Sequence, residues 1–226
     1  MKVYSSIFFD LDNTLLDFHK AENRAIKKVL SKHGLPASEE IANIYSQINK
    51  SYWERFEKGE IEKSEIFEGR FKTLFKVIGC EGDTAAIQKD YFVFLSEGCD
   101  KVDGAIEILE YLKNNGYKIY ATTNGVALTQ FKRIKNSGLE PYFDKVFVSE
   151  DTGHQKPEKE YFDYVIANIP EKDKTRMLII GDSQSSDILG GVNSGIDTCW
   201  FNINGSDPKY KSQYEISALS ELKGIL

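Results

Sequence analysis

Short apolar runs alternate with helix-forming segments through the second half of the chain. The runs that predict strands are YKIYATTN, KVFVS, MLIIGD and DTCWF. Helical periodicity covers residues 105–115, 126–138, 158–169 and 187–194, and ALSELKGI predicts a last helix. Strands that alternate with helices form a parallel sheet with helices on both faces, and the continuous apolar character of residues 177–180 suits a strand buried on both sides. We therefore expect an α/β fold with a Rossmann-like parallel sheet core.

A block of four helices is expected between the first strand and this repeating part. Apolar residues recur with helical spacing in four stretches, which begin near Ala21, Ile41, Phe67 and Ala85. The block interrupts the sheet domain after the strand IFFD. We predict a catalytic core of residues 1–15 and 100–226 and an inserted all-helical cap domain of residues 16–99.

Composition limits the classes of function. The chain has 226 residues, 41% of them hydrophobic, which suits one large domain or a domain with an insertion. The formal net charge is −6 and no basic block occurs, so we expect neither a nucleic-acid polymer nor an anionic membrane as partner. The three cysteines are widely spaced and indicate neither a disulfide framework nor a zinc site. The N-terminal apolar run is too short for a signal peptide, which favours a cytoplasmic protein.

The stretch IFFDLDNTLLD places two acids at the end of the first predicted strand. Asp10 and Asp12 are two residues apart, so in an extended segment both side chains project to the same side. Two negative charges held close together are unfavourable without a cation or a shared proton. Asp, Asn and Thr are also ordinary turn residues, so this stretch alone decides nothing. Asp17 is best interpreted as a helix N-cap.

Polar residues also end the other predicted strands. They are Thr122, Thr123 and Asn124 after YKIYA, Lys156 after KVFVSEDTGHQ, and Asp182 and Asp187 in MLIIGDSQSSD. Ligands of open parallel sheets bind at the carboxyl ends of the strands, so these side chains are expected at one edge. Carboxylates, a hydroxyl and a lysine are the groups that metal-assisted phosphoryl transfer requires. A cation and the lysine would explain why Asp10 and Asp12 are kept together.

These same motifs carry a resemblance to a known family. DLDNT, TTNG, KPEKEYF and GDSQSSD resemble, in order, the four signature motifs of the haloacid dehalogenase-like superfamily, and the helical insertion resembles its C1-type cap. Four such motifs in the right order are improbable by chance, although each one alone is weak. The segments SGLEPYFDKVFVSED and GGVNSGIDTCWFN further resemble the branch of these phosphatases that acts on pyrimidine nucleoside monophosphates.

The resemblance implies a role for each motif residue. Asp10 would be the nucleophile that forms an aspartyl-phosphate, and Asp12 would be the general acid and base. Thr123 and Asn124 would bind the phosphoryl group, and Lys156 would balance the negative charges of the nucleophile and the phosphate.

The resemblance also implies a metal site. Mg²⁺, with Mn²⁺ as a substitute, would be held by Asp10, the backbone carbonyl of Asp12, and Asp182. Asp187 would act directly or through water.

The substrate is expected to be a small phosphomonoester selected by the cap. Because the cap aromatics Tyr45, Tyr52 and Phe56 fall on a helical stripe, we interpret them as core. Trp53 and Phe18 are the candidates for contacting a base or sugar. The three histidines show no ligand spacing and are interpreted as surface or loop residues.

Other functions stay open at this level. The same core motifs serve phosphatases of sugar phosphates or phosphoglycolate and also phosphomutases. Dehalogenation is disfavoured, because those relatives need no acid at the position of Asp12 and no metal. A non-catalytic binding protein is disfavoured because a scaffold without chemistry has no physical need for crowded acids. The sequence is silent on the oligomeric state.

Overall fold

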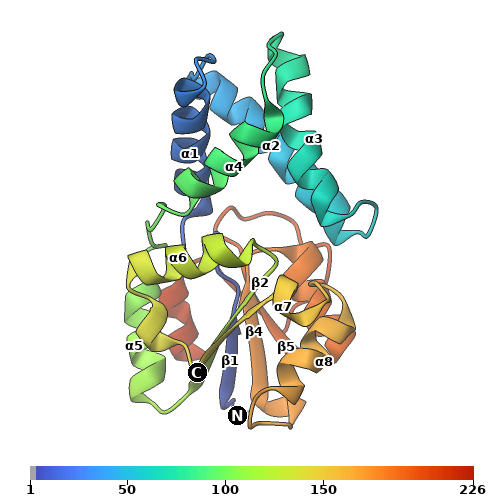
Figure 1. Ribbon diagram of the computed structural model, residues 1–226. Helices are drawn as coiled ribbons and strands as arrows, with labels where there is room; N and C mark the ends of the chain where they lie inside the picture. Colours follow the sequence, from blue (N-terminus) through green and yellow to red (C-terminus); the bar gives the residue numbers. More distant parts are fainter. Residues whose placement is uncertain (1–3) are drawn as a thin grey trace. The chain divides into compact units, whose positions relative to one another are not determined.

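The computed structural model describes residues 4–226 and contains a six-stranded, all-parallel sheet. The strands lie in the order β3-β2-β1-β4-β5-β6 (Figure 1). Their bounds are β1 Ser6–Phe9, β2 Lys118–Thr123, β3 Lys145–Val148, β4 Met177–Gly181, β5 Asp197–Phe201 and β6 Tyr214–Ile216. In the central strand β1 every residue is buried, as expected for a strand covered on both faces.

Helices cover the sheet, with α5 (Ala105–Asn114) and α8 (Lys159–Ala167) on opposite sides (Figure 1). Tyr161 and Phe162 of α8 pack with Phe8 of β1 and Tyr120 of β2 in one buried apolar cluster. The other helical segments of this part are α7 Ser149–Thr152, η1 Glu140–Tyr142, η2 Lys174–Arg176, η3 Gln184–Ile188, α9 Leu189–Ser194 and η4 Leu219–Gly224. The predicted α/β class with a parallel sheet is therefore confirmed.

The segment after β1 forms four helices: α1 Phe18–Lys32, α2 Glu39–Glu57, α3 Lys63–Ile78 and α4 Thr84–Leu95. Ser38 caps α2 by accepting a hydrogen bond from the backbone N–H of Ile41, and Asp83 caps α4 in the same way. Gly79 ends α3 in the left-handed conformation, which glycine adopts without steric cost. A buried apolar cluster holds the four helices together.

The aromatic residues of the predicted cap divide into buried and half-buried residues. Tyr45 and Phe56 are buried, which confirms their prediction as core residues. Tyr52 is half-buried, and its hydroxyl lies 3.0 Å from the Thr73 hydroxyl.

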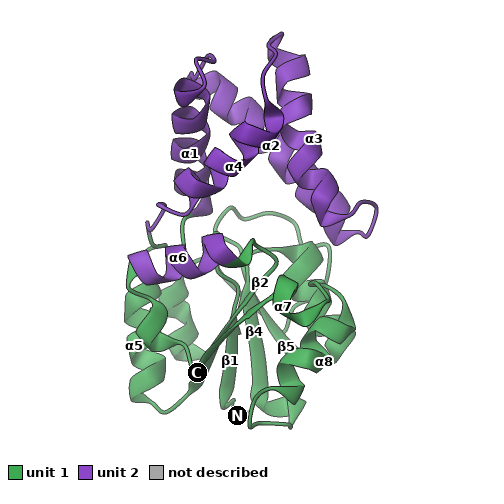
Figure 2. Cartoon of the chain, viewed as in Figure 1, with its two compact units in different colours: residues 1–17, 101–127, 137–226 green, residues 18–100, 128–136 purple. Residues whose placement is uncertain are grey.

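The chain divides into two compact units (Figure 2). One contains the described residues up to Asp17 together with 101–127 and 137–226, and holds the sheet. The other contains residues 18–100 and also 128–136, which belong to helix α6 (Ala127–Ser137). The sequence interpretation assigns that helix to the core. Among the described residues, no helix combines the length and the apolar character needed to cross a membrane.

Candidate active site

The carboxyl ends of β1, β2 and β4 meet at one edge of the sheet. The register pairs Phe9 of β1 with Ala121 of β2 and with Ile180 of β4. The backbone N–H of Asp10 extends the ladder by donating to the carbonyl of Ile180, at 2.9 Å. This register brings the residues that follow the three strands close together, as the sequence predicts.

Lys156 is the cation of the site. Its ammonium Nζ donates to Asp10 Oδ1 and to Asp187 Oδ1, both at 2.7 Å, and to the Thr122 carbonyl at 2.9 Å. The side chain is 1% exposed. Burial alone would lower the pKa of Lys156, but the negative charges of Asp10 and Asp187 raise it above the usual lysine value. Lys156 is therefore charged and fixed between two acids.

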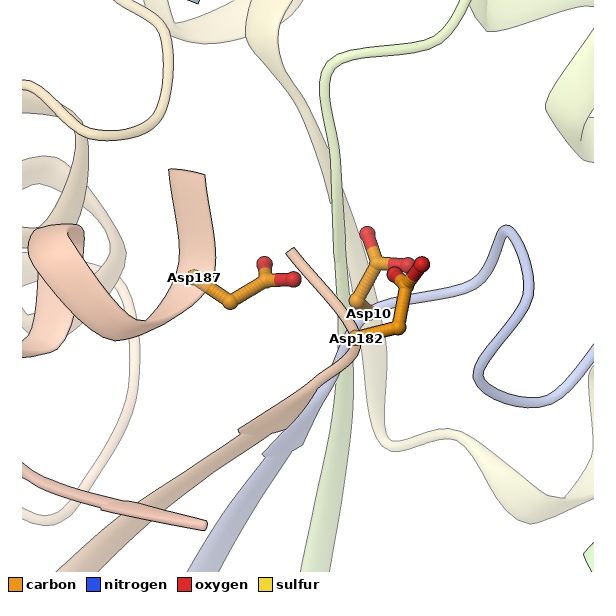
Figure 3. A group of neighbouring side chains, drawn as sticks. All are labelled: Asp10, Asp182 and Asp187. Carbon is orange, nitrogen blue, oxygen red and sulfur yellow. The ribbon is translucent and has the colours of Figure 1, made fainter. Parts of the chain in front are cut away.

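Three carboxylates gather beside this lysine. One oxygen each of Asp10, Asp182 and Asp187 lies within 4.8 Å of the others. Figure 3 shows the Asp187 side chain reaching toward Asp10 and Asp182 from the segment that follows β4. Burial raises the pKa of Asp10 to about 7, and Lys156 opposes that shift while Asp187 and Asp12 add to it. Desolvation, followed by the charges of Asp10 and Asp187, also raises the pKa of Asp182 well above its usual value.

This set of donors fits a divalent cation. It consists of carboxylate oxygens without sulfur or imidazole, which is the hard ligand type that Mg²⁺ and Mn²⁺ prefer. The acids crowd more negative charge than Lys156 alone neutralises, and a bound cation would remove that excess.

Asp187 is fully buried, and both of its oxygens already have protein partners. Oδ1 accepts from Lys156 and Oδ2 accepts from the backbone N–H of Ser183, at 3.1 Å. These bonds hold Asp187 and Lys156 in a defined geometry. Asp187 therefore positions Lys156, and each of its oxygens keeps a lone pair that could face a cation directly or through water.

Gly181 leaves the space that the Asp187 carboxylate fills. A Cβ atom built on Gly181 would lie 2.1 Å from Asp187 Oδ2. We expect Gly181→Ala to displace Asp187, to lower the free energy of unfolding by about 1–3 kcal/mol through overpacking, and to cost roughly 100-fold in kcat through misplacement of Lys156.

Chemical denaturation and steady-state kinetics with p-nitrophenyl phosphate would measure these two effects. Gly224→Ala is the matched control, because a Cβ there meets no atom within 4 Å. Equal behaviour of the two variants would contradict the packing role of Gly181.

A tight turn carries Asp12 away from β1. Asn13 has a φ of 60°, a left-handed conformation that asparagine tolerates better than most residues. Its backbone N–H donates to the carbonyl of Leu16 at 2.7 Å. The buried Thr14 hydroxyl accepts from the backbone N–H of Asp182 at 3.1 Å and so ties the first motif to the fourth. Asp12 itself is half-buried, so part of it is in contact with solvent.

Thr123 is the last residue of β2 and Asn124 follows it, and their side chains have different partners. The Thr123 hydroxyl accepts from the backbone N–H of Gly125 at 3.0 Å, and a hydroxyl that accepts can also donate its own hydrogen. The Asn124 side chain is committed to the backbone of Lys156: Nδ2 donates to its carbonyl and Oδ1 accepts from its N–H, each at 2.9 Å. Asn124 therefore holds the Lys156 segment, and its own backbone carbonyl accepts from the Ser149 hydroxyl at 3.4 Å.

The two predicted cap contacts, Phe18 and Trp53, lie in the helical unit and pack against apolar clusters. The Arg133 guanidinium lies 5.6 Å from the centre of the Phe18 ring. Trp53 meets Phe56 edge-on, with ring centres 5.7 Å apart. Both rings are half-buried, and their contact with a substrate stays a prediction.

Comparisons with known proteins all point to the same family. The family model described as haloacid dehalogenase-like hydrolase matches residues 4–195. YfnB of Bacillus subtilis, named as a HAD-hydrolase, is 42% identical over all of this chain and 97% of its own length. A solved structure of YfnB, described as bound to magnesium, covers 100% of this chain and 99% of its own, with a TM-score of 0.93.

Two other relatives have named activities. The pyrimidine 5'-nucleotidase PynA of Streptococcus pneumoniae is 36% identical over 99% of this chain and 95% of its own length. The pyrimidine 5'-nucleotidase YjjG of Escherichia coli is 31% identical over 97% of this chain and 96% of its own length.

Proposed function

The chain belongs to the haloacid dehalogenase-like hydrolase family, and on that premise we propose that it is a magnesium-dependent phosphatase of pyrimidine nucleoside 5'-monophosphates. The observation that carries the chemistry is the buried Lys156, which binds both Asp10 and Asp187 beside Asp182. The similarity to PynA and YjjG over nearly the whole chain supports the nucleotide substrate.

Asp10 acts as the nucleophile. A carboxylate oxygen of Asp10 attacks the phosphorus, an O–P bond forms, and the bond from phosphorus to the ester oxygen breaks. Lys156 donates to Oδ1 of Asp10 and so fixes the orientation of the attacking carboxylate. The product of this step is an aspartyl-phosphate on Asp10.

Asp12 moves the protons. It donates a proton to the leaving ester oxygen, which departs as the alcohol of the nucleoside. Asp12 then accepts a proton from the water that attacks the phosphorus of the aspartyl-phosphate, which returns Asp10 and releases inorganic phosphate. Its half-buried position in the turn suits a group that must exchange protons with solvent.

The other site residues bind and orient the phosphate. The Thr123 hydroxyl and the backbone of Asn124 bind phosphoryl oxygens, and Lys156 offsets the negative charge that Asp10 and the phosphoryl group bring together.

Three groups would hold the cation. Asp10, Asp182 and the carbonyl of Asp12 would hold Mg²⁺, which supplies further positive charge to the phosphoryl oxygens when bound. Asp187 holds Lys156 in place.

We also propose that the helical unit is the cap that selects the substrate, because the site residues assigned above bind only the phosphoryl group and the cation. Phe18 and Trp53 are the aromatic candidates for substrate contact in that unit. Base stacking on such rings contributes on the order of 1–3 kcal/mol in nucleic-acid binding.

Removal of the divalent cation is expected to abolish turnover. Without it the charges of Asp10, Asp182 and the substrate phosphate repel one another, so attack on phosphorus becomes unfavourable. The measurement is phosphate release from uridine, cytidine, thymidine and adenosine 5'-monophosphates, glucose 6-phosphate and phosphoglycolate, with Mg²⁺, with excess chelator, and after Mg²⁺ is restored.

We expect activity to disappear with chelator, to return with Mg²⁺, and to be highest on the pyrimidine nucleotides. Full turnover in excess chelator would rule out the metal-assisted mechanism. A preference for glucose 6-phosphate or phosphoglycolate would overturn the nucleotide substrate and leave the phosphatase chemistry intact.

A further inference from the structure

Asp182 differs from the other two acids of the site in how its side chain is held. Asp10 and Asp187 each accept a hydrogen bond from Lys156. Among the residues that the structure describes, no group donates a hydrogen bond to the Asp182 carboxylate. One of its oxygens nevertheless lies within 4.8 Å of an oxygen of each of the other two acids (Figure 3). The backbone of Asp182 must therefore set the position of its carboxylate.

Side chains from other segments fix the backbone on both sides of Asp182. Its N–H donates to the Thr14 hydroxyl at 3.1 Å, and its carbonyl accepts from the indole Nε1–H of Trp200 at 2.9 Å. The N–H of that second peptide group belongs to Ser183 and donates to Asp187 Oδ2 at 3.1 Å. The two planar peptide groups that flank a Cα atom set its dihedral angles, so these bonds also set the direction of the Asp182 side chain.

Trp200 is a well-fixed donor. It belongs to β5, which is paired with β4 on one side and β6 on the other. The register places Trp200 opposite Gly181, the residue immediately before Asp182. The side chain is buried, and a close-packed interior leaves a large ring little freedom to move. The indole N–H can only donate, so its bond to the Asp182 carbonyl has a defined direction.

The acceptor of this bond connects Trp200 to the acids. A buried indole N–H needs an acceptor in any fold, and any carbonyl would serve that need. Here the acceptor belongs to the peptide group between Asp182 and Ser183, whose N–H donates to Asp187, which in turn accepts from Lys156. Hydrogen bonds in such a chain polarise one another. Groups that orient metal ligands from behind typically change metal affinity by roughly 10- to 100-fold when they are removed.

We propose that Trp200 is a positioning residue of the cation site, which holds the peptide group of Asp182 so that the carboxylate already points toward the cation position before a cation binds. Trp200 acts through Asp182 and lies outside the four motifs of the sequence. The inference rests on the proposed function, which it deepens by naming a residue that prepares the site for Mg²⁺. Loss of the indole N–H should therefore weaken cation binding.

Trp200→Phe removes the donor and keeps an aromatic ring in β5. We expect the Kd for Mg²⁺, measured by calorimetry without substrate, to rise roughly 10-fold. The Mg²⁺ concentration that gives half-maximal turnover of p-nitrophenyl phosphate should rise by the same factor. The kcat at saturating Mg²⁺ should stay close to the wild-type value, because a bound cation itself attracts the Asp182 carboxylate into place.

Two further proteins separate this role from simple packing. Tyr117→Phe is the matched control: the Tyr117 hydroxyl also donates to a backbone carbonyl at 2.9 Å, that of Leu226, and Tyr117 precedes β2, at the edge of the sheet opposite the site. This control should leave the Kd for Mg²⁺ unchanged. Replacement of Trp200 by β-(3-benzothienyl)alanine keeps the size of the ring system and removes only the N–H, so it should raise the Kd as Trp200→Phe does and avoids the smaller ring of phenylalanine.

An unchanged Kd for Mg²⁺ in the benzothienylalanine protein, or an equal rise in Tyr117→Phe, would overturn the positioning role of Trp200. Wild-type protein that binds no Mg²⁺ would overturn the cation site and this inference with it. Wild-type protein that binds Mg²⁺ and hydrolyses no phosphomonoester would overturn the proposed function alone, and the Mg²⁺ titrations would still test Trp200.

Discussion

Asp10→Asn is expected to reduce turnover to background on every phosphomonoester, including aryl phosphates with good leaving groups. The substitution removes the anionic oxygen that attacks phosphorus, so no covalent intermediate can form and a better leaving group gives no rescue. The fold should survive, because the asparagine carbonyl can still accept the hydrogen bond that Lys156 donates to Asp10 Oδ1. Steady-state phosphate release, with a thermal unfolding curve as control, measures both effects. An active, correctly folded Asp10→Asn enzyme would contradict the assignment.

Asp12→Asn is expected to lose roughly 10²–10⁴-fold in turnover of nucleotides, whose leaving alcohol needs a proton. The loss should be smaller for the first half-reaction with p-nitrophenyl phosphate, because its leaving group departs without protonation. Dephosphorylation should slow with both substrates, since the attacking water lacks its base. Rapid-quench kinetics would separate the two half-reactions: a burst of p-nitrophenol followed by slow turnover is expected. Equal losses in both half-reactions on both substrates would argue against the acid–base role.

The sheet was predictable because its main strands are continuous apolar runs. Residues 177–180 illustrate this, since all of them are buried. β6 (Tyr214–Ile216) was not predicted: it has three residues, and Glu215 in its middle is exposed, so the pattern is too short and too polar. The predicted last helix is a 3₁₀ segment, η4 (Leu219–Gly224), and the predicted helix 187–194 begins as the π-helical turn η3 (Gln184–Ile188). Helix type depends on local hydrogen bonding that periodicity does not reveal.

The candidate site was predictable in its residues and less so in their tasks. Asp10, Lys156, Asp182 and Asp187 follow strands, and the parallel register brings them together. The Asn124 side chain makes two hydrogen bonds with the backbone of Lys156, 32 residues further along the chain. No local sequence pattern signals such a contact. Two other contacts could not be predicted from local sequence either. One is the hydrogen bond from the backbone N–H of Asp182 to the Thr14 hydroxyl, and the other is the packing of the Asp187 carboxylate into the space that Gly181 leaves.

The buried polar network of the helical unit was not predicted, although one signal was present. Glu22 lies among the apolar positions Ala21, Ala25 and Ile26 of the first helical stripe, where a charged side chain is out of place. The structure shows that it faces inward and is paired through Asn49 with the buried Arg70. A buried acid on an apolar stripe is therefore a sequence signal for an internal polar network, whose partners only the tertiary structure identifies.

The location of the covalent phosphate tests the central claim most directly. The Asp12→Asn enzyme should accumulate the intermediate during turnover of p-nitrophenyl phosphate, and acid quenching followed by peptide mapping with mass spectrometry would locate it. We predict a single phosphorylated site, at Asp10 in the peptide that contains IFFDLNNTLLD after the substitution. A phosphate on any other residue, or phosphate release without a phosphorylated enzyme in either the variant or the wild-type protein, would contradict the account.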